Sequence, residues 1–449
     1  MQQLVIIGGD AAGMSAASQV RRMQPELGIT VFERGSYTSY AACGIPYYVA
    51  GLVEDKGRLI ARTPETFRKK FRINTLMHHE VLAIYPDKQR ILVRDLDTGR
   101  DLSEPYDQLL IATGAQAVTT GFDGEQCDNV HQVSTLVHAE AMARALAGET
   151  IRKVVIVGGG YIGIEMAEAL HLRGLEVSMV HRGPQVMATM DPDMGSFISE
   201  ALRQSGIKLH LETALEGFVQ EKGKVTGVLT SQGVFPADMV ILGLGVRPTS
   251  RLAREAGIAL GPKDSIRVNE LQQTEQENIW AAGDCAQSFH LVSRRPVHIA
   301  LGTVANRQGR VAGINLGGGY ATFPGVVGTS IVKFMDTECS RTGLSERELK
   351  RLGWHYVQAV IEDHTMPRYY PGSSVMHVKV LAEKGSGKLL GVQIVGGPGA
   401  AKRIDTAAIA LHAGMDLDTF INVDLSYAPP FSGVWDPIVT AAKQAIKEV

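Results

Sequence analysis

The chain has few cysteines, and their spacing fits no common framework. Only four occur among 449 residues: Cys43, Cys127, Cys285 and Cys339. Thiols this far apart form neither the disulfide framework of a small secreted domain nor a zinc-ligand pattern. We therefore expect reduced thiols, and any reactive cysteine has to be identified singly.

Candidate metal ligands are equally sparse. His78 and His79 are adjacent in a segment expected to be a strand, where neighbouring side chains point to opposite faces. No carboxylate or thiol completes a ligand set with them, so the sequence predicts no metal site.

Strong charge and long hydrophobic runs are also lacking. The formal net charge is −2 and the basic residues are scattered, which argues against a nucleic-acid or membrane partner and favours small molecules. The apolar run at the N-terminus breaks at Gly8, too early for a signal or membrane-spanning segment. We expect a cytoplasmic protein of two or three domains.

Glycine, in contrast, is abundant, and it gathers in two similar motifs. The apolar run 4–7 is followed by GGDAAG at 8–13 and by a helical pattern to about Met23. The run 154–157 is followed by GGGYIG at 158–163 and by a second helical pattern. In such strand–turn–helix units the glycines let the turn close and bring the helix N-terminus against a pyrophosphate. The sequence therefore predicts an α/β protein with two Rossmann-like dinucleotide sites.

The residue that ends the second strand of each unit indicates which nucleotide is bound. Glu33 ends that strand in the first unit, where a carboxylate can accept hydrogen bonds from an adenosine ribose. A solvated strand end is the alternative. In the second unit the corresponding residues are His181 and Arg182, and the acid is missing. A cationic or donor pair suits a 2'-phosphate, so NADPH is expected there, alongside NADH.

Other segments are predicted to return the chain to the first nucleotide. Residues 106–115 and 237–248 each form a strand ending in glycine turns, as expected where a chain crosses between two dinucleotide domains. The strand in 274–286 ends at Gly283 and Asp284, where a carboxylate could bind a polyol such as the ribitol of a flavin, or cap a helix. The helix predicted at 299–313 could direct its positive end at the same ligand.

Cys43 lies in the small-residue segment SYAACGIPYY, residues 39–48. Pro46 suits the first turn of a helix, which would put Cys43 near a helix N-terminus. A thiolate is stabilised there and becomes more nucleophilic at neutral pH. An inert buried thiol is the alternative, and it is our interpretation for the other three cysteines.

The order of these motifs resembles a known family. GGDAAG, SYAACG, YDQLLIATG, GGGYIG, GLGVRP, WAAGDCA and YAPPFSGVWDP occur in the order typical of the pyridine nucleotide-disulfide oxidoreductases. The resemblance is strongest to the single-cysteine branch, which contains coenzyme A-disulfide reductases, NADH oxidases, NADH peroxidases and persulfide reductases. Two-cysteine members carry a Cys-x4-Cys pair, whereas Thr38 and Tyr48 stand here. Cys43 would instead pair with the sulfur of the substrate or become a sulfenic acid.

The resemblance implies a domain organisation. It predicts a discontinuous FAD-binding domain at 1–113 and 247–323, an NAD(P)H-binding domain at 114–246 and an α+β dimerisation domain at 324–449. In the implied homodimer, Tyr369 and Tyr427 reach Cys43 of the other subunit and assist proton transfer when the substrate thiolate leaves.

The remaining site residues are carried over from the same resemblance. The FAD site would comprise Gly8, Ala12, Gly13, Glu33, Arg34, Thr113, Gly114, Asp284, Ala300 and Thr303. The NAD(P)H site would comprise Gly158, Gly160, Tyr161, Ile162, Gly163, Glu165, His181 and Arg182, with Tyr161 swinging aside when the nucleotide binds. Substrate contacts would come from Ser15, Gln19, Arg22, Ser39, Ala42 and Asn306.

The function implied is reduction of coenzyme A disulfide, or of a related CoA persulfide or polysulfide, by NAD(P)H through FAD and Cys43. Three residues depart from the family pattern. Asp10 replaces the middle glycine of the first turn, and Ala42 replaces a residue that is often polar. Ala11 stands where oxidases and peroxidases have a histidine. The alternatives are an NAD(P)H oxidase that uses dioxygen and a flavoprotein redox sensor that signals to a partner.

Overall fold

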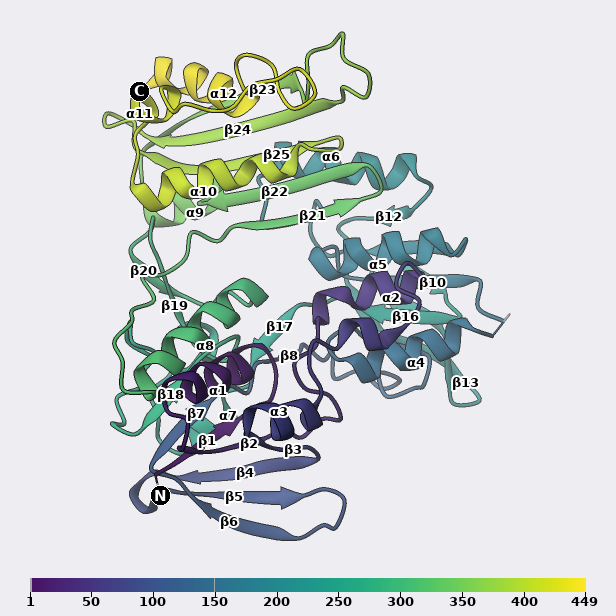
Figure 1. Ribbon diagram of the computed structural model, residues 1–449. Coiled ribbons are helices and arrows are strands. Elements are labelled where there is room, and N and C mark those ends of the chain that lie inside the picture. The colour runs from purple at the N-terminus through teal and green to yellow at the C-terminus, as the bar shows by residue number, and fades with distance from the viewer. Residues whose placement is uncertain (1, 149) are drawn as a thin grey trace.

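The computed structural model describes residues 2–148 and 150–449. Three five-stranded sheets organise the molecule, which is drawn in Figure 1 with the first at the bottom, the second on the right and the C-terminal sheet at the top. The N- and C-termini therefore lie at opposite ends. No helix in the described ranges is both long and apolar enough to cross a membrane.

The first two sheets are parallel, and four of the five strands in each have the same order. The first runs β18 (Ile279–Ala281), β7 (Gln108–Ile111), β1 (Gln3–Ile7), β2 (Gly28–Phe32), β3 (Asn74–Leu76). The second runs β9 (Val130–Gln132), β16 (Met239–Leu242), β10 (Lys153–Val157), β11 (Glu176–Val180), β12 (Lys208–His210). Their central strands are buried apolar runs, as expected for parallel sheets with both faces covered. The prediction of two Rossmann-like units in an α/β fold is confirmed.

Each of these two sheets carries a three-stranded antiparallel sheet beside it. The first has β4 (His79–Tyr85), β5 (Arg90–Asp95) and β6 (Asp101–Pro105), and the second has β13 (Leu215–Glu221), β14 (Lys224–Thr230) and β15 (Gly233–Pro236). The chain passes between the two units along β8 (Ala115–Ala117) and returns along β17 (Val246–Pro248), and these strands pair antiparallel. A further hairpin, β19 (Ser288–His290) and β20 (Arg295–Val297), leads toward the C-terminal sheet (Figure 1).

Helices follow the strands. In the first unit they are α1 (Ala11–Met23), α2 (Ile45–Ala50), α3 (Pro64–Phe71), α7 (Arg251–Glu255) and α8 (Gly302–Leu316). In the second they are α4 (Leu136–Leu146), α5 (Tyr161–Leu172) and α6 (Pro192–Gln204). α1 and α8 can pack closely because Gly309 has no Cβ, which would overlap the backbone of Ala12. The N-terminal turn of α1 therefore lies against the middle of α8.

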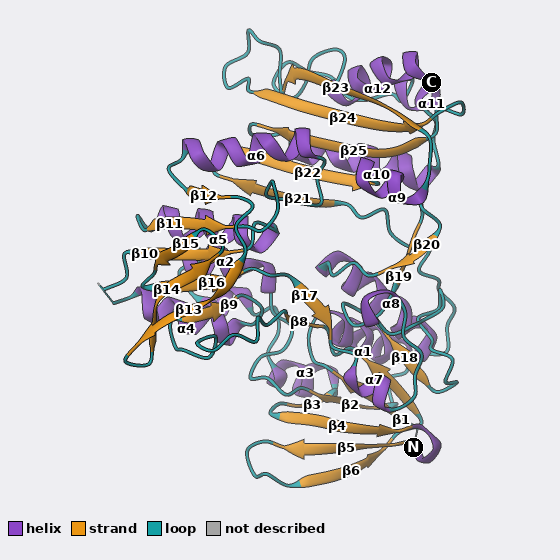
Figure 2. Ribbon diagram, turned by 180° about the vertical axis from the view of Figure 1, so that it is seen from behind, coloured by secondary structure: helices purple, strands orange, loops and turns teal. Residues whose placement is uncertain are grey.

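The C-terminal sheet is antiparallel and separates two layers of helix. Its strands are β21 (Ser330–Phe334), β22 (Thr337–Gly343), β25 (Leu389–Gly396), β24 (Val375–Glu383) and β23 (Tyr356–His364), with α9 (Glu346–Leu352), α10 (Ile404–Ala413), α11 (Leu417–Ile421) and α12 (Pro437–Ala445). Side chains alternate between the two faces of a strand. Val380 and Val392 therefore enter the core with α10 and α12, whereas the paired residues Lys379 and Gln393 face α6 (Figure 2).

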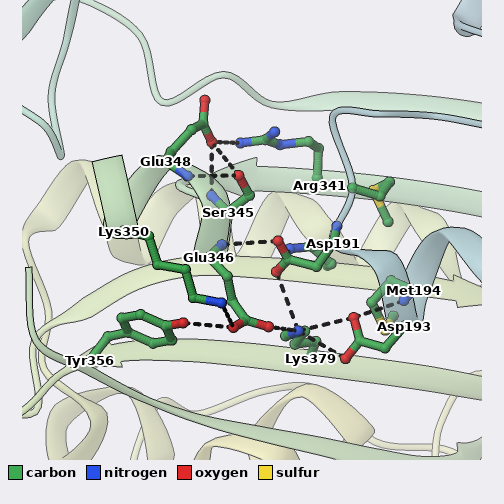
Figure 3. A network of polar contacts seen from close by, with 12 residues as sticks. Asp191, Asp193, Met194, Arg341, Ser345, Glu346, Glu348, Lys350, Tyr356 and Lys379 are labelled. Carbon is green, nitrogen blue, oxygen red and sulfur yellow. Dashed lines mark hydrogen bonds and ion pairs between the residues drawn. The ribbon is translucent and has the colours of Figure 1, made fainter. Parts of the chain in front are cut away.

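A buried ion cluster joins the C-terminal sheet to the second unit at this face (Figure 3). The Lys379 side chain is 0% exposed, and its Nζ lies 2.8 Å from Asp193, 2.5 Å from Glu346 and 3.3 Å from Asp191. Gln393 donates to Asp191 at 2.6 Å and accepts from its backbone N–H at 2.8 Å. The three carboxylates lie close enough together to hold a cation, and the lysine ammonium fills that position. The cluster therefore fixes the start of α6 on the sheet.

The expectation that His78 and His79 both lie on a strand is wrong for His78. His78 precedes β4 and adopts a left-handed backbone with φ 56°. Its Nδ1 lies 3.0 Å from a carboxylate oxygen of Asp97, and its Nε2 lies 3.1 Å from the Ser36 hydroxyl. The hairpin between β5 and β6 brings this carboxylate to His78. The absence of a metal stays a prediction.

Replacing Lys379 by methionine would leave buried carboxylates without a counter-charge. Removing one partner of a buried ion pair costs about 3–5 kcal/mol. We therefore expect Lys379→Met to lower the unfolding temperature in scanning calorimetry by several degrees. The matched control is Lys350→Met, because Lys350 contacts Glu346 of the same cluster but its side chain is 68% exposed. Equal unfolding temperatures for the two variants would contradict this role of Lys379.

Candidate active site

Two glycine turns occupy matching places in the two units. Gly8 follows β1 and Gly158 follows β10, with φ of 107° and 113°. A Cβ at these positions would overlap the carbonyl oxygens of Ala112 and Gly243, which follow the neighbouring strands β7 and β16. Only glycine fits there. Each turn directs the N-terminus of α1 or α5 to the crevice at the carboxyl ends of the strands, where dinucleotides bind.

The residue after the second strand binds the glycine turn in both units. Glu33 accepts from the backbone N–H groups of Gly9 and Gly35, both at 2.7 Å. His181 does the same through Nδ1, which accepts from the N–H of Gly159 at 3.1 Å. Both residues therefore lie beside a turn, as expected for contacts to a ribose or its phosphate. Arg34 and Arg182, the next residues, are exposed.

His181 is a neutral hydrogen-bond donor. Its Nδ1 accepts a hydrogen bond, so the proton is on Nε2, which is buried and has no partner among the described residues. Burial, and then the charge of Arg182, lowers the pKa of His181. Of the two roles expected for this residue, the structure favours donor rather than cation.

Asp284 fits a flavin ribitol. It follows Gly283 at the end of β18, and its Oδ1 is buried without a partner in the described part of the chain. Burial raises the pKa of this carboxyl to about 6. A polyol hydroxyl would satisfy such an acceptor. Nearby, Thr113 donates to the backbone oxygen of Thr249 at 2.5 Å, and the N–H of Thr249 donates to Gly114 at 2.9 Å.

Asp10, which replaces the middle glycine of the first glycine turn, points toward the segment that carries Cys43. Its carboxylate accepts from the N–H of Tyr40 at 3.2 Å. Burial, and then the charges of Glu33 and Asp284, raises the pKa of Asp10 to about 6. The side chain is thus used to connect two parts of the site.

Residues 38–40 are tied to the first glycine turn by two further contacts. The buried Thr38 hydroxyl donates to the backbone oxygen of Gly9, and the N–H of Ser39 donates to the same oxygen at 3.1 Å. Thr38 occupies the position where two-cysteine members would carry a cysteine, and here it fastens the segment in place. Ser39 adopts φ 50°, and its carbonyl accepts from Ala61 at 2.8 Å.

Cys43 lies in a 3-10 turn at 42–44, immediately before α2 with Pro46 in its first turn. This placement near a helix start is confirmed. Cys43 is exposed, whereas Cys127, Cys285 and Cys339 are buried. The expected stabilisation of the thiolate is wrong for the protein's own groups. Partial burial, and then the negative charges of Glu165 and Asp284, raises the pKa of the Cys43 thiol.

Glu165 belongs to the second unit, and its negative charge acts on the Cys43 thiol. α2 packs on α5, where Ile45 and Val49 join the core that contains Ile164. Burial, and then the charge of Glu168, raises the pKa of Glu165 to about 7. This residue was assigned to nucleotide binding, and its closeness to Cys43 has no signal in the sequence because the two positions lie in different units.

The structure gathers four of the expected substrate contacts on α1 and α8. The Ser15 hydroxyl donates to the backbone oxygen of Asn306 at 3.1 Å, and Arg22 donates to Gln19 at 3.2 Å. The other two expected residues, Ser39 and Ala42, lie in the segment that leads to Cys43. Ala300 and Thr303, expected to contact flavin, flank the start of α8.

Tyr369 and Tyr427 lie apart from these residues. Their side chains are 75% and 48% exposed. They belong to the loop between β23 and β24 and the segment after α11, at the top of Figure 1, whereas α2 packs on α4 and α5 of the second unit. One chain alone therefore does not bring them to Cys43.

Sequence reasoning missed the contacts of Tyr161. This residue begins α5, and its hydroxyl lies 2.5 Å from the Ser330 hydroxyl on β21 and 3.3 Å from that of Thr189. Ser330 lies in the segment expected to be a dimerisation domain. No local pattern marks such a contact, because it joins positions far apart in the chain.

Comparison with known proteins supports a common ancestry over the whole chain. Residues 2–309 match a family model described as pyridine nucleotide-disulphide oxidoreductase, and residues 329–437 match the model of its dimerisation domain. An NAD(P)H coenzyme A polysulfide/persulfide reductase of Pyrococcus horikoshii is 38% identical, with 98% of each chain covered. An NADH oxidase of Methanocaldococcus jannaschii is 36% identical over 99% of each chain.

Similarity extends to disulfide reductases and to solved structures. A coenzyme A disulfide reductase of Staphylococcus epidermidis is 32% identical, covering 96% of this chain and 97% of its own. The structure of an NAD-dependent persulfide reductase from A. fulgidus superposes with a TM-score of 0.96 at 35% identity, covering 99% of this chain and 83% of its own. The fold is therefore shared with these proteins.

Alkylation of Cys43 by iodoacetamide should respond to Glu165. Only the thiolate reacts, and the negative charge of Glu165 disfavours it. We expect Glu165→Gln to lower the pKa of Cys43 and to shift the rate profile to lower pH. The rate is measured by mass spectrometry of the labelled peptide, on protein reduced and freed of small thiols.

Two controls accompany this measurement. Glu200→Gln, on an exposed position of α6, should leave the profile unchanged. Cys43→Ser should remove the label from the folded protein, because the other cysteines are buried. An unchanged profile in Glu165→Gln would contradict the influence of Glu165 on the thiol.

Proposed function

The chain belongs to the pyridine nucleotide-disulphide oxidoreductase family, and on this premise we propose that it reduces coenzyme A disulfide, or a related CoA persulfide or polysulfide, with NAD(P)H through FAD and Cys43. The family is FAD-dependent and uses NAD(P)H as substrate. Action on a CoA-linked sulfur compound is what we propose for this chain.

The observation that carries it is the isolation of Cys43. Of the four cysteines, all within the described ranges, it alone is exposed. Thr38 is buried in a structural contact, so no protein thiol stands ready to form a disulfide with Cys43. An external sulfur is then the partner that disulfide chemistry requires.

The proposed reaction is thiol–disulfide exchange followed by two-electron reduction. The Cys43 thiolate attacks one sulfur of the substrate disulfide, the disulfide bond breaks, and one thiolate leaves while Cys43 forms a mixed disulfide with the other half. When bound, FAD supplies the chemistry that carries two electrons from NAD(P)H to this mixed disulfide. Reduction returns Cys43 as a thiolate and releases the second thiol.

The residues around Cys43 support this exchange. The raised pKa of Glu165, about 7, puts a carboxyl that can hold or release a proton near the thiol at neutral pH. Asp284 and the start of α8 are proposed to hold the FAD. They would act with residues of the first glycine turn, the start of α1 and the segments that follow β2 and β7: Gly8, Ala12, Gly13, Glu33 and Thr113. Ser15, Gln19, Arg22 and Asn306 are proposed to bind the CoA portion, because Arg22 can pair with a phosphate.

The nucleotide bound at the second turn is proposed to be NADPH as well as NADH. His181 offers a neutral N–H at the place where Glu33 offers a carboxylate in the first unit. A carboxylate there would repel a 2'-phosphate, whereas an N–H donor and the neighbouring exposed Arg182 can bind it. Gly158, Gly160, Ile162 and Gly163 would line the pyrophosphate.

A homodimer completes the proposed site. Tyr369 and Tyr427 are proposed to act on the partner's Cys43, since neither reaches it within one chain. Near Tyr427 the side chains of Phe431, Val434 and Trp435 are 75%, 70% and 56% exposed, and such a large apolar patch is typical of a protein interface. The domain limits 1–113 with 247–323, 114–246 and 324–449 are proposed with it.

An NAD(P)H oxidase is the second candidate, favoured by the similarity to a protein named NADH oxidase. Ala11 counts against it, because the oxidase members of the family typically have a histidine at this position. Dioxygen chemistry would then lack a proton donor at that position.

Anaerobic titration distinguishes these candidates. The holoenzyme is reduced with NADPH, and in a parallel experiment with NADH, and then receives coenzyme A disulfide, CoA persulfide or air while the flavin absorbance is recorded. We expect rapid reoxidation by a CoA-linked sulfur compound and slow reoxidation by air. Cys43→Ser should still be reduced but lose reoxidation by the sulfur compounds. Rapid reoxidation by air alone would favour the oxidase.

Mixing inactive variants tests whether the tyrosines act across the interface. If Tyr427 serves the partner's Cys43, a mixed dimer of Cys43→Ser and Tyr427→Phe subunits contains one complete site. Random reassociation of equal amounts should then restore about a quarter of the normal site number. Activity that stays at the mean of the two separate variants would show that Tyr427 acts within its own chain.

A further inference from the structure

The contact between Tyr161 and Ser330 is not explained by the proposed reaction. Tyr161 is the first residue of α5, directly after the glycine turn, and the two hydroxyl oxygens are 2.5 Å apart. Thr189 supplies a second, longer contact at 3.3 Å. The tip of the ring is thus held between the C-terminal sheet and the loop before α6.

One face of α5 points toward both Cys43 and β21. Residues three or four apart on a helix share a face, so Tyr161, Glu165 and Glu168 lie on the same side. Glu165 acts on Cys43 through its charge, and Glu168 forms an ion pair with Lys333 of β21. A nucleotide that extends from the glycine turn toward Cys43 has to pass the end of this face, where Tyr161 lies.

β21 is aligned with α5 at two matched points. Tyr161 and Glu168 are separated by ~10 Å along a helix, and Ser330 and Lys333 by ~10 Å along a strand. The pair Tyr161–Ser330 and the ion pair Glu168–Lys333 therefore fix the strand beside the helix at both ends.

The loop that carries Thr189 is fixed independently. Arg341 of β22 donates to the backbone oxygen of Thr189, and Asp191 joins the cluster around Lys379. Phe197 of α6 stacks on His377 of β24, with ring centroids 3.7 Å apart. Neither hydroxyl partner of Tyr161 can therefore follow the ring when it moves.

We propose that Ser330 is a positioning residue that holds the Tyr161 side chain in its resting place, and that NAD(P)H has to break this hydrogen bond in order to bind. The inference rests on the proposed binding of NAD(P)H at the second glycine turn. It goes beyond that binding by giving a residue of the C-terminal sheet control over how readily the nucleotide enters. The hydrogen bond between Tyr161 and Ser330 stabilises the resting state, and the free energy of NAD(P)H binding is less favourable by that amount.

Calorimetric titration of the oxidised holoenzyme with NADP+ tests the proposal without turnover. Ser330→Ala and Tyr161→Phe each remove the hydrogen bond and keep the ring. We expect each to lower the Kd for NADP+ about two- to tenfold, the contribution of one neutral hydrogen bond. Their combination should give no further gain, because both changes remove the same contact. In steady state, Ser330→Ala should lower KM for NADPH while kcat changes little.

The direction of the change in Kd distinguishes a positioning role of Ser330 from structural damage. A structural defect would weaken nucleotide binding, whereas loss of the hydrogen bond strengthens it. The matched control is Ser340→Ala on β22, a buried serine of the same sheet whose hydroxyl has no partner among the described residues. Ser330→Ala values equal to those of Ser340→Ala would overturn the proposal.

The outcome for the unmodified protein separates the two levels of inference. If it binds NADP+ and NAD+ but the variants do not differ, the role of Ser330 is wrong and the proposed function stands. If it binds neither nucleotide, the proposed function is wrong and the role of Ser330 is wrong with it.

Discussion

At Gly8 and Gly158 the chain passes so close to the end of a neighbouring strand that a methyl group would overlap a carbonyl oxygen. The rest of the site depends on these two close approaches. They direct the start of α1 and α5 into the crevices, and the oxygen of Gly9 then becomes an anchor for Thr38 and Ser39. Cys43 follows this anchored segment. The position of the thiol is therefore set by the same turn that forms the first nucleotide site.

Cys43 lies among carboxyl groups rather than cations. Asp10 and Asp284 approach from the first unit and Glu165 from the second, and all three have a raised pKa because they are partly buried. Partial burial and these charges disfavour the thiolate of Cys43 in the protein alone. In the proposed reaction, formation of the thiolate is accordingly favoured by the bound cofactor and substrate rather than by a basic side chain.

Features that depend on neighbouring residues were predictable from the sequence. Both strand–turn–helix units, the helix start at Pro46 and the acceptor at Glu33 follow from short motifs, because the local backbone decides them. Features that depend on contacts between distant segments were not. Burial raises the pKa of the Cys43 thiol, whereas a lowered pKa was expected. A hairpin places Asp97 beside His78, and Ser330 of the C-terminal sheet contacts Tyr161 of the second unit. Lys379 lies in an apolar strand, and nothing in that strand reveals which carboxylates it meets.

The two units also share one contact that is made by residues of different charge. Glu33 and His181 make the same contact, a side-chain acceptor to a backbone N–H of the glycine turn, although one is an acid and the other a neutral ring. The contact therefore does not depend on the charge of the residue that makes it. A strand end of this kind can present different charges to a ligand while the turn beside it keeps the same backbone support.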